Sequence, residues 1–235
     1  MNKQNYHPQQ DVFRLIDGKK ESIQPYRFSD ERERMSQPKK QAATGTHIES
    51  IMFDGKTLTT TAVNDQGEKT IQQLPAVSGL NPEKPFSYSP LRQRLPDRGP
   101  IPEGNYFVNP QKIQKPTLAQ DVLGRVGKKI NSVLETIPIK KRKFPTGRYP
   151  GGRTSWGNER TPIKNDPEVT KNTGRDNFFI HGGKEPGSGG CIDLTNHEKS
   201  FFDFLRKYRG KEQTAVPLTV KYPPELTGED IIDNY

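Results

Sequence analysis

The scarcity of apolar residues is the feature that most constrains how this chain can fold. Hydrophobic residues make up 29% of its 235 residues, and glycine and proline each occur 21 times. A chain of this length supplies one domain of ordinary size with additional segments, or two small domains. Segments without apolar residues have nothing to bury and need not join a packed core. We therefore expect one folded body that carries unstructured or inserted stretches.

Three regions follow from where the apolar residues lie. Residues 1–46 are polar, rich in Gln, Lys, Arg and Pro, and show no sustained hydrophobic periodicity, so we expect a disordered N-terminal arm. The folded domain is expected over residues 47–222, and an acidic tail over residues 223–235. We interpret the arm as a candidate delivery segment, with a plain unstructured tail as the alternative.

The sequence shows no targeting or membrane-spanning segment. Residues 1–20 hold only the apolar pairs Val12-Phe13 and Leu15-Ile16, which are too few for the core of a signal peptide. No stretch approaches the roughly 18 apolar residues of a membrane span. We expect a protein that is made in the cytoplasm without a signal peptide and has no membrane span.

Short alternating runs predict a mainly β fold with a few helices. Asp54-Gly55 suits the tight turn of a hairpin between strands at 48–53 and 56–63, and a strand at 69–74 would extend it into a meander. Further strands are expected over residues 105–108, 177–180, 191–194 and 214–222.

Two other stretches complete the expected domain. Residues 148–177 are rich in glycine and polar residues and are expected to be a loop. Thr195 and Glu198 have the spacing of a capping box, and apolar residues at helical spacing follow, so a helix is expected over 201–209.

Residues 117–137 are expected to form an amphipathic helix. Their apolar residues recur mainly at every fourth position, and Thr117 with Gln120 has the spacing of a capping box. Gly124 and Gly127 each weaken such a helix by roughly 1 kcal/mol relative to alanine. We interpret it as a helix packed on the folded body, with a helix at a membrane surface as the alternative.

Positive charge is concentrated in a basic helical insertion at about 109–153. Eleven Lys and Arg residues there face only two acids, so its net charge of +9 equals that of the whole chain. Clustered basic residues suit nucleic acid, but the segment lacks interleaved aromatics and any zinc-ligand spacing, so no nucleic-acid partner is expected. We favour a solvated basic face, or one that steers the protein toward an anionic cell envelope.

The single cysteine is the main candidate for chemistry. Cys191 cannot form an internal disulfide, and it lies ten residues after His181 across a glycine-rich connection. A thiol with a pKa near 8.5 needs a neighbouring imidazole to become a nucleophile at neutral pH. The amides of Gly189, Gly190 and Cys191 are candidates for holding an oxyanion. The pattern indicates acyl transfer through a thioester.

The simpler alternative is a structural pair, because a lone cysteine is often a small buried hydrophobe and a lone histidine a hydrogen-bonded structural group. The glycines directly before Cys191 favour the catalytic interpretation, since a structural cysteine gains nothing from them. One cysteine and one histidine do not make a zinc site, so no metal or cofactor is expected. The glycine string also lacks the Gly-Lys-Ser/Thr ending of a phosphate loop.

The string HxxxxxxSxGC, formed by His181, Ser188, Gly190 and Cys191, resembles the signature of YkuD-type L,D-transpeptidases. Together with the segments at 99–106 and 156–160, it is most similar to the branch of type VI secretion L,D-transpeptidase effectors. The resemblance covers roughly residues 48–222 and implies a β-rich catalytic domain. It also implies peptidoglycan tetrapeptide stems as the substrate.

The resemblance implies a role for each motif residue. Cys191 would attack the carbonyl of meso-diaminopimelate and expel the terminal D-Ala, with His181 as general base and acid. Ser188 and the Gly189 backbone would orient the histidine, and the amides of Gly190 and Cys191 would hold the oxyanion. Water, a free D-amino acid or a second stem would resolve the acyl-enzyme. The candidate substrate-binding residues are Tyr149, Arg153, Trp156, Gly182 and Asp193.

The resemblance also implies a place of action and partners. The protein would be an antibacterial effector that works in the periplasm of target bacteria, with a secretion-machine carrier and a cognate immunity protein as partners. Many related enzymes have His and Arg where this chain has Gly189 and Asp193. We expect the basic segment 109–153 to supply the missing positive charge. The alternatives are a non-catalytic envelope- or nucleic-acid-binding module and a cytoplasmic cysteine peptidase.

Overall fold

The computed structural model describes residues 13–16, 19–22, 45–80, 86–136 and 143–227. The chain divides into two units, residues 1–42 and residues 43–235. In the first unit, β1 (Phe13–Ile16) and β2 (Lys19–Ser22) pair antiparallel. This hairpin differs from the disordered arm expected there, and Asp17-Gly18 between the strands is a sequence that favours tight turns. The remaining arm residues through 44 lie outside the described residues.

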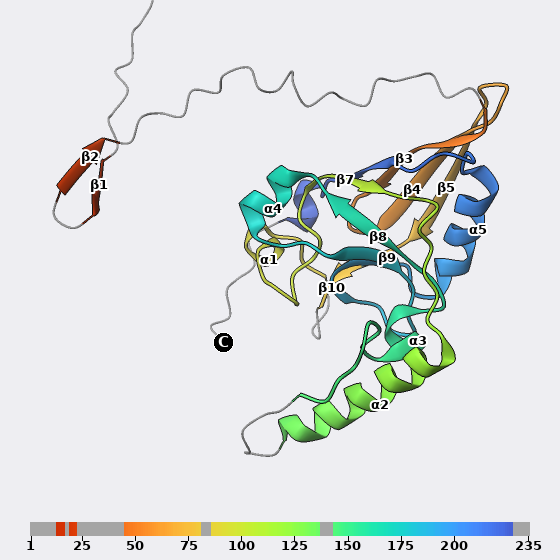
Figure 1. Ribbon diagram of the computed structural model, residues 1–235. Helices are drawn as coiled ribbons and strands as arrows, with labels where there is room; N and C mark the ends of the chain where they lie inside the picture. Colours follow the sequence, from red (N-terminus) through yellow and green to blue (C-terminus); the bar gives the residue numbers. More distant parts are fainter. Residues whose placement is uncertain (1–12, 17–18, 23–44, 81–85, 137–142, 228–235) are drawn as a thin grey trace, which may run out of the picture. The chain divides into compact units, whose positions relative to one another are not determined.

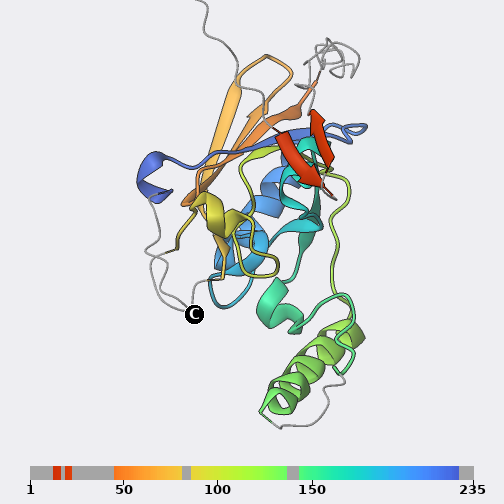
Figure 2. The ribbon, with the colours of Figure 1, turned by 90° about the vertical axis from the view of Figure 1, so that its left-hand side faces the viewer.

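The second unit is built on one nine-stranded sheet, which confirms the mainly β fold (Figures 1 and 2). The strand order is β5-β4-β3-β11-β7-β8-β9-β10-β6, with parallel pairing only in β3–β11 and β9–β10. The strands are β3 (His47–Phe53), β4 (Thr57–Val63), β5 (Lys69–Pro75), β6 (Val77–Gly79), β7 (Gly104–Val108), β8 (Arg160–Asn165), β9 (Phe178–His181), β10 (Ser188–Asp193) and β11 (Val216–Val220).

The sheet curls into a near-barrel because of the way β5 meets β6. These two strands stand at opposite ends of the strand order, yet only Ala76 separates them in the chain. The two edges of the sheet must therefore approach each other at Ala76. The Ala76 amide donates to the Lys56 carbonyl at 2.9 Å, which ties this seam to the turn after β3. Closure of this kind protects edge strands that would otherwise be open to pairing.

The apolar core lies between the sheet and α5 (Glu198–Tyr208), which packs against β3 and β5 (Figure 1). Phe201, Phe202 and Leu205 on this helix are fully buried, as are Ile180 and Ile192 on the sheet. Burying each large apolar side chain stabilises the fold by about 2 kcal/mol.

Residues 148–177, expected to be a loop, hold three elements: α3 (Gly152–Trp156), β8 and α4 (Pro167–Thr173). The prediction was wrong because β8 contains Pro162 and several polar residues, and it forms by pairing with β7 and β9. The helix α4 carried local signals that the prediction overlooked. Asp166 caps its N-terminus, and Gly174 ends it in the left-handed conformation.

The capping box expected at Thr195 and Glu198 is absent. A short 3₁₀ turn, η2 (Thr195–His197), precedes α5, and neither Thr195 nor His197 caps the helix with its side chain. The Glu198 carboxylate instead accepts hydrogen bonds from the Asn158 backbone at 2.8 Å and side chain at 2.9 Å. The spacing of a capping box was present, but a partner distant in sequence competes for the glutamate.

The helix expected over 117–137 is α2 (Leu118–Glu135), and the capping box between Thr117 and Gln120 is confirmed. Its packing differs from the expectation. Gly124 and Gly127 pack against the chain around residues 145–152, and a Cβ at Gly124 would collide with the Tyr149 carbonyl. The apolar stripe is exposed, rather than packed on the body. No helix within the described residues is long and apolar enough to cross a membrane.

Two further short elements belong to the folded domain. They are α1 (Pro90–Gln93) and η3 (Pro224–Leu226). Leu226 packs against the core, and its carbonyl accepts the Tyr88 amide at 3.1 Å. The packed region therefore extends past the expected boundary at 222 into the start of the acidic tail. Residues 228–235 lie outside the described residues.

Candidate active site

His181 and Cys191 lie on adjacent parallel strands, β9 and β10. The strand register pairs Ile180 with Ile192, and His181 with Asp193. Side chains alternate between the two faces of a sheet, and Ile180 and Ile192 face the core. His181, Cys191 and Asp193 therefore share the opposite face, outside the apolar core. The fold thus brings together the two residues that the motif singled out.

A third strand adds a cation to the same face. Arg160 on β8 pairs with His181 on β9, which pairs with Asp193 on β10. The three side chains form a row across three neighbouring strands, with Cys191 two positions before Asp193. Same-face neighbours on adjacent strands are close enough to interact.

The hydrogen bonds of His181 define its tautomer. Its Nδ1 lies 2.6 Å from the Gly182 carbonyl oxygen, and its Nε2 lies 3.0 Å from Ser188 Oγ. A carbonyl can only accept, so Nδ1 carries the proton and donates it to Gly182. In the neutral ring Nε2 is then an acceptor, and the Ser188 hydroxyl donates to it. The ring is therefore oriented with its basic nitrogen toward Ser188.

The Ser188 side chain also contacts Cys191, as does the backbone of Phe179, and both contacts lower the pKa of the thiol. The hydroxyl of Ser188 therefore links the imidazole of His181 to the sulfur. Among the described residues, no hydrogen bond joins the thiol directly to the imidazole. The arrangement is a chain of three groups in which one hydroxyl contacts both the candidate nucleophile and the candidate base.

Burial keeps both groups uncharged in this state. It raises the pKa of Cys191 to about 11, and the contacts with Phe179 and Ser188 and the charge of Arg160 only partly oppose the rise. Burial also lowers the pKa of His181 to about 4; the Gly182 hydrogen bond opposes this effect and Arg160 reinforces it. Desolvation disfavours the ionised form of either group. At neutral pH the site therefore holds a thiol and a neutral imidazole.

Trp156 on α3 covers the site. Its ring centroid lies 4.9 Å from that of His181 and 5.6 Å from that of Phe179, and its Nε1 donates to the Pro150 carbonyl at 3.0 Å. Under this cover Cys191 is 5% exposed and His181 is 1% exposed. The sulfur is therefore almost inaccessible to a peptide in this state.

The guanidinium of Arg160 is enclosed by aromatic rings. Its central carbon lies 3.9 Å from the ring centroid of Tyr149, 4.6 Å from that of Trp156 and 4.3 Å from that of Phe179. Its Nε and Nη1 donate to the Gln114 side chain and the Arg148 carbonyl, respectively. Cation–π contacts stabilise a desolvated guanidinium of this kind. The cation is thus held at a fixed position near the thiol.

Arg160 was the main residue that sequence reasoning missed. It was noted only as part of the 156–160 segment, without a role. Many related enzymes have an arginine at the position of Asp193, and we expected the basic segment 109–153 to supply the missing positive charge. Instead, Arg160 and Arg175, which lie outside that segment, interact electrostatically with Cys191. A charged residue at the start of a strand was the available signal, but the strand itself was not predicted.

Asp193 braces the loop that carries Ser188. Its Oδ2 accepts the Gly187 amide at 3.0 Å, and its Oδ1 accepts the Thr195 amide at 2.8 Å. Burial raises its pKa to about 6, although these two hydrogen bonds oppose the rise. Because Gly187 directly precedes Ser188, the carboxylate acts on the position of the hydroxyl that contacts His181.

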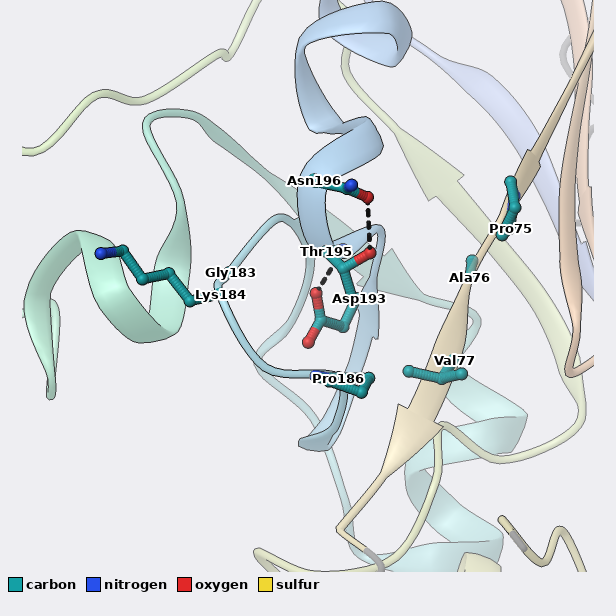
Figure 3. A pocket seen from close by; sticks show the side chains of 9 residues that line it. All are labelled: Pro75, Ala76, Val77, Gly183, Lys184, Pro186, Asp193, Thr195 and Asn196. Atoms are coloured by element: carbon teal, nitrogen blue, oxygen red, sulfur yellow. Dashed lines mark hydrogen bonds between the residues drawn. The ribbon is translucent and has the colours of Figure 1, made fainter.

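A cavity of about 670 Å³ lies on the other side of this loop, at the barrel seam (Figure 3). Asp193, Thr195 and Asn196 line one side of it, and Ala76 and its neighbours face them across the opening. Cys191 is not among its lining residues, which are Pro75, Ala76, Val77, Gly183, Lys184, Pro186, Asp193, Thr195 and Asn196. The cavity adjoins the site through Asp193 without exposing the sulfur.

The two glycines before the thiol are tightly packed. A Cβ at Gly189 would collide with the Asp97 carbonyl, and one at Gly190 would lie 2.5 Å from Nη2 of Arg175. Gly190 also has a φ of +110°, which favours glycine. Arg175 in turn donates to the Gly99 and Pro100 carbonyls. This buried arginine therefore fixes both the loop and the backbone next to Cys191.

The remaining candidate substrate-binding residues differ in their placement. Tyr149 and Trp156 lie at the site, and Gly182 contributes its carbonyl to His181. Arg153 does not come with them: its amide donates to Asp121 on α2 at 2.7 Å, and its Nη2 donates to the Pro116 carbonyl at 3.3 Å. It anchors α3 to α2, because the turn at Gly151 and Gly152 directs it there.

Comparison with known proteins places the chain in a family. No curated protein matches the sequence. Among solved structures the chain is similar to the protein described as "Structure of Bdellovibrio bacteriovorus Bd1075", at 14% identity and a TM-score of 0.38, over 74% of this chain and 47% of that one. The present chain thus spans about half the length of that protein.

A family model described as the Tlde1 domain matches residues 73–219, which run from β5 through β11 and include every strand of the site. This match covers more than half of the chain. The protein therefore belongs to the Tlde1 domain family of type VI secretion L,D-transpeptidase effectors, which are enzymes that modify peptidoglycan.

Proposed function

We propose that the chain removes or exchanges the terminal D-Ala of peptidoglycan tetrapeptide stems, with Cys191 as nucleophile and His181 as base. The observation that carries the proposal is the hydroxyl of Ser188, which contacts His181 Nε2 at 3.0 Å and the thiol of Cys191. A structural cysteine has no need of this path to a basic nitrogen.

The first half-reaction forms a thioester. The sulfur of Cys191 attacks the carbonyl carbon between meso-diaminopimelate and D-Ala, while its proton passes to Ser188 and the Ser188 proton passes to His181 Nε2. The tetrahedral intermediate collapses with cleavage of the C–N bond. His181 returns its proton to the departing amine, so D-Ala leaves as a free amino acid.

The second half-reaction resolves the thioester. Water loses a proton to His181 and attacks the same carbonyl carbon, the C–S bond breaks, and the thiol is restored. A free D-amino acid in place of water gives exchange, and the amine of a second stem gives a cross-link. Gly190 and Cys191 amides are proposed to hold the oxyanion in both steps, because preorganised donors stabilise charge that develops there.

Activation must overcome the neutral resting state of the pair. Arg160 supports the thiolate, because its charge lowers the pKa of Cys191. The same charge opposes an imidazolium at His181. We therefore propose that His181 acts as a transient proton acceptor during attack, and that displacement of Trp156 by the stem opens the way to the sulfur.

The family match supports delivery of the enzyme to other bacteria. We propose that it acts in the periplasm of the target cell, reaches a secretion-machine carrier through residues 1–46, and has a cognate immunity protein. The Tlde1 match covers residues 73–219, so these proposals for the arm rest on the family as a whole.

The test is mass spectrometry of soluble disaccharide-tetrapeptide after incubation with the wild type, Cys191→Ala and Cys191→Ser. The wild type should yield the tripeptide and free D-Ala, and with an added D-amino acid it should yield the exchanged tetrapeptide. Both variants should lose product while keeping the melting temperature of the wild type within a few degrees. Product formation by Cys191→Ala would refute the proposed nucleophile. If the tetrapeptide remains unchanged after incubation with folded wild-type protein, the proposed reaction is refuted.

A further inference from the structure

The helix α2 has an apolar face that the folded body leaves uncovered. Leu118, Val122, Val126 and Val133 are 71%, 44%, 48% and 56% exposed. At 3.6 residues per turn these four side chains fall within an arc of about 80° on the helix. Figures 1 and 2 both show α2 projecting away from the sheet. A contiguous exposed apolar patch usually marks a surface that binds something.

The orientation of this face is fixed by the opposite side of the helix. Gly124 packs against the chain at Tyr149, and the Gly151 amide donates to the Gly124 carbonyl at 2.9 Å. Asp121 accepts the Arg153 amide on the same side. These contacts need small or polar residues at the helix surface, so the helix cannot turn its valines inward without losing them.

Two basic residues, Lys129 and Arg125, lie at the apolar face. Both are exposed: Lys129 falls within the apolar arc, between Leu118 and Val122, and Arg125 falls about 20° outside it. Of the two acids in the surrounding segment, Asp121 is buried and paired with Arg125 at 3.2 Å. Lys129 therefore supplies a positive charge within the face, whereas the charge of Arg125 at its border is paired with Asp121.

We propose that this face of α2 docks on an anionic phospholipid surface, with the helix lying in the plane of the interface. Amphipathic helices with an aliphatic face and Lys/Arg borders bind membranes through buried apolar area and attraction to anionic lipids. The binding requires no step of the reaction proposed above.

The composition of the face favours lipid over the other occupants. A second copy that docked face to face would bring two Lys129 ammonium groups near each other, and like charges repel. Protein interfaces are enriched in Tyr, Trp and Arg and depleted in Lys. This face has valines and a leucine around Lys129, and no tryptophan or tyrosine lies on α2. A flat aliphatic strip also lacks the polar groups that give a protein interface its register.

The test is co-sedimentation of the full chain with phosphatidylcholine vesicles, with and without phosphatidylglycerol. The wild type should sediment with the anionic vesicles and much less with the neutral ones. The double variant Val122→Ser/Val126→Ser should lower the partition coefficient by about tenfold or more, because two aliphatic side chains no longer enter the lipid. Lys129→Glu should lower it by roughly tenfold through charge.

Matched controls distinguish binding through this face from non-specific adsorption of the protein to vesicles. Ile71 and Leu91 are each 60% exposed on β5 and α1, so Ile71→Ser/Leu91→Ser removes comparable apolar surface elsewhere. Lys221→Glu reverses an exposed charge away from α2. Both controls should sediment like the wild type. Equal loss in the controls, or no loss in the α2 variants, would overturn the proposal.

A second measurement reports directly on the helix. A tryptophan introduced by Val126→Trp should shift its emission to the blue and be quenched by brominated lipid, whereas the wild type, with only Trp156, should show neither effect. Failure of the wild type to bind anionic vesicles would overturn the proposal, as would a dimer that Val122→Ser/Val126→Ser dissolves. Cys191→Ala should bind anionic vesicles like the wild type. The vesicle test therefore gives the same result whether or not the catalytic proposal holds.

Discussion

Ser188 donates a hydrogen bond to His181 Nε2 over 3.0 Å, and the same hydroxyl contacts the Cys191 thiol. The Gly182 carbonyl fixes the tautomer that makes this donation necessary. A proton on the sulfur therefore has a path to a basic nitrogen through one side chain. We therefore propose a role for Ser188 in proton transfer, in addition to the orienting role that the family resemblance implied.

Ser188→Ala should slow the reaction while leaving the fold intact. Loss of a positioned proton-transfer group costs about 10²-fold to 10⁴-fold in rate. We expect kcat for D-Ala release to fall in this range with little change in KM, and Ser188→Thr to restore part of it because the hydroxyl is retained. Full activity of Ser188→Ala would show that Cys191 and His181 exchange the proton without this hydroxyl.

Arg160→Gln should move the ionisation of Cys191 to higher pH. The charge of Arg160 lowers the pKa of Cys191, so its removal raises that pKa further. The rate of thiol alkylation by iodoacetamide, measured against pH, should reach half its plateau at a higher pH than in the wild type. Arg153→Gln is the matched control, since the Arg153 guanidinium donates to the Pro116 carbonyl and no contact within the described part of the chain joins it to Cys191. The same profile in both variants would exclude an electrostatic role for Arg160.

Asp193 should make the protein less stable as pH rises from about 4 to about 6. Its folded pKa of about 6 lies above the ordinary value of 3.8, so the unfolded chain releases this proton first. The contribution is fully present below pH 4 and is lost as pH passes 6, with an expected fall of about 1–3 kcal/mol. Urea unfolding at a series of pH values should show this slope, and Asp193→Asn should remove it.

The same substitution should also affect catalysis. An asparagine has one oxygen for the two amides of Gly187 and Thr195 that Asp193 now holds. The loop before Ser188 should loosen, and kcat for D-Ala release should fall even where the variant is fully folded. An unchanged kcat in Asp193→Asn would limit the carboxylate to a structural role.

Gly190→Ala should impair both stability and activity. The added Cβ would lie 2.5 Å from Arg175 and 2.7 Å from the Phe178 ring, at a backbone φ of +110°. We expect a loss of stability of about 2–4 kcal/mol in thermal unfolding, together with loss of D-Ala release. Gly174→Ala is the control, because Gly174 also has a positive φ but nothing lies within 4 Å of its Cβ position. Similar losses in both variants would assign the effect to backbone strain alone.

The parts of the fold that were predicted from sequence depend on neighbouring residues. Asp54 accepts the amides of Lys56 and Thr57, which makes the predicted hairpin turn. Thr117 and Gln120 cap α2 as their spacing indicated. Such turns and caps close within a few residues, so the local sequence is sufficient to specify them.

The strand β8 and the start of α5 could not be predicted in this way. Arg160 to Asn165 becomes a strand only because β7 and β9 offer edges on both sides. Glu198 does not form the expected capping box because its carboxylate accepts a hydrogen bond from Asn158, forty residues earlier. Long-range pairing of this kind overrides local propensity.

The sequence by itself determined the His181–Cys191 motif, the mainly β class and the start of the amphipathic helix, because these are patterns of residue type and spacing. Only the tertiary structure decided that the sheet closes at Ala76, that Arg160 lies beside the thiol, that α2 turns its valines outward and that Cys191 and His181 rest uncharged. Those features arise from strand pairing, close backbone packing and the removal of water, which depend on residues far apart in the chain.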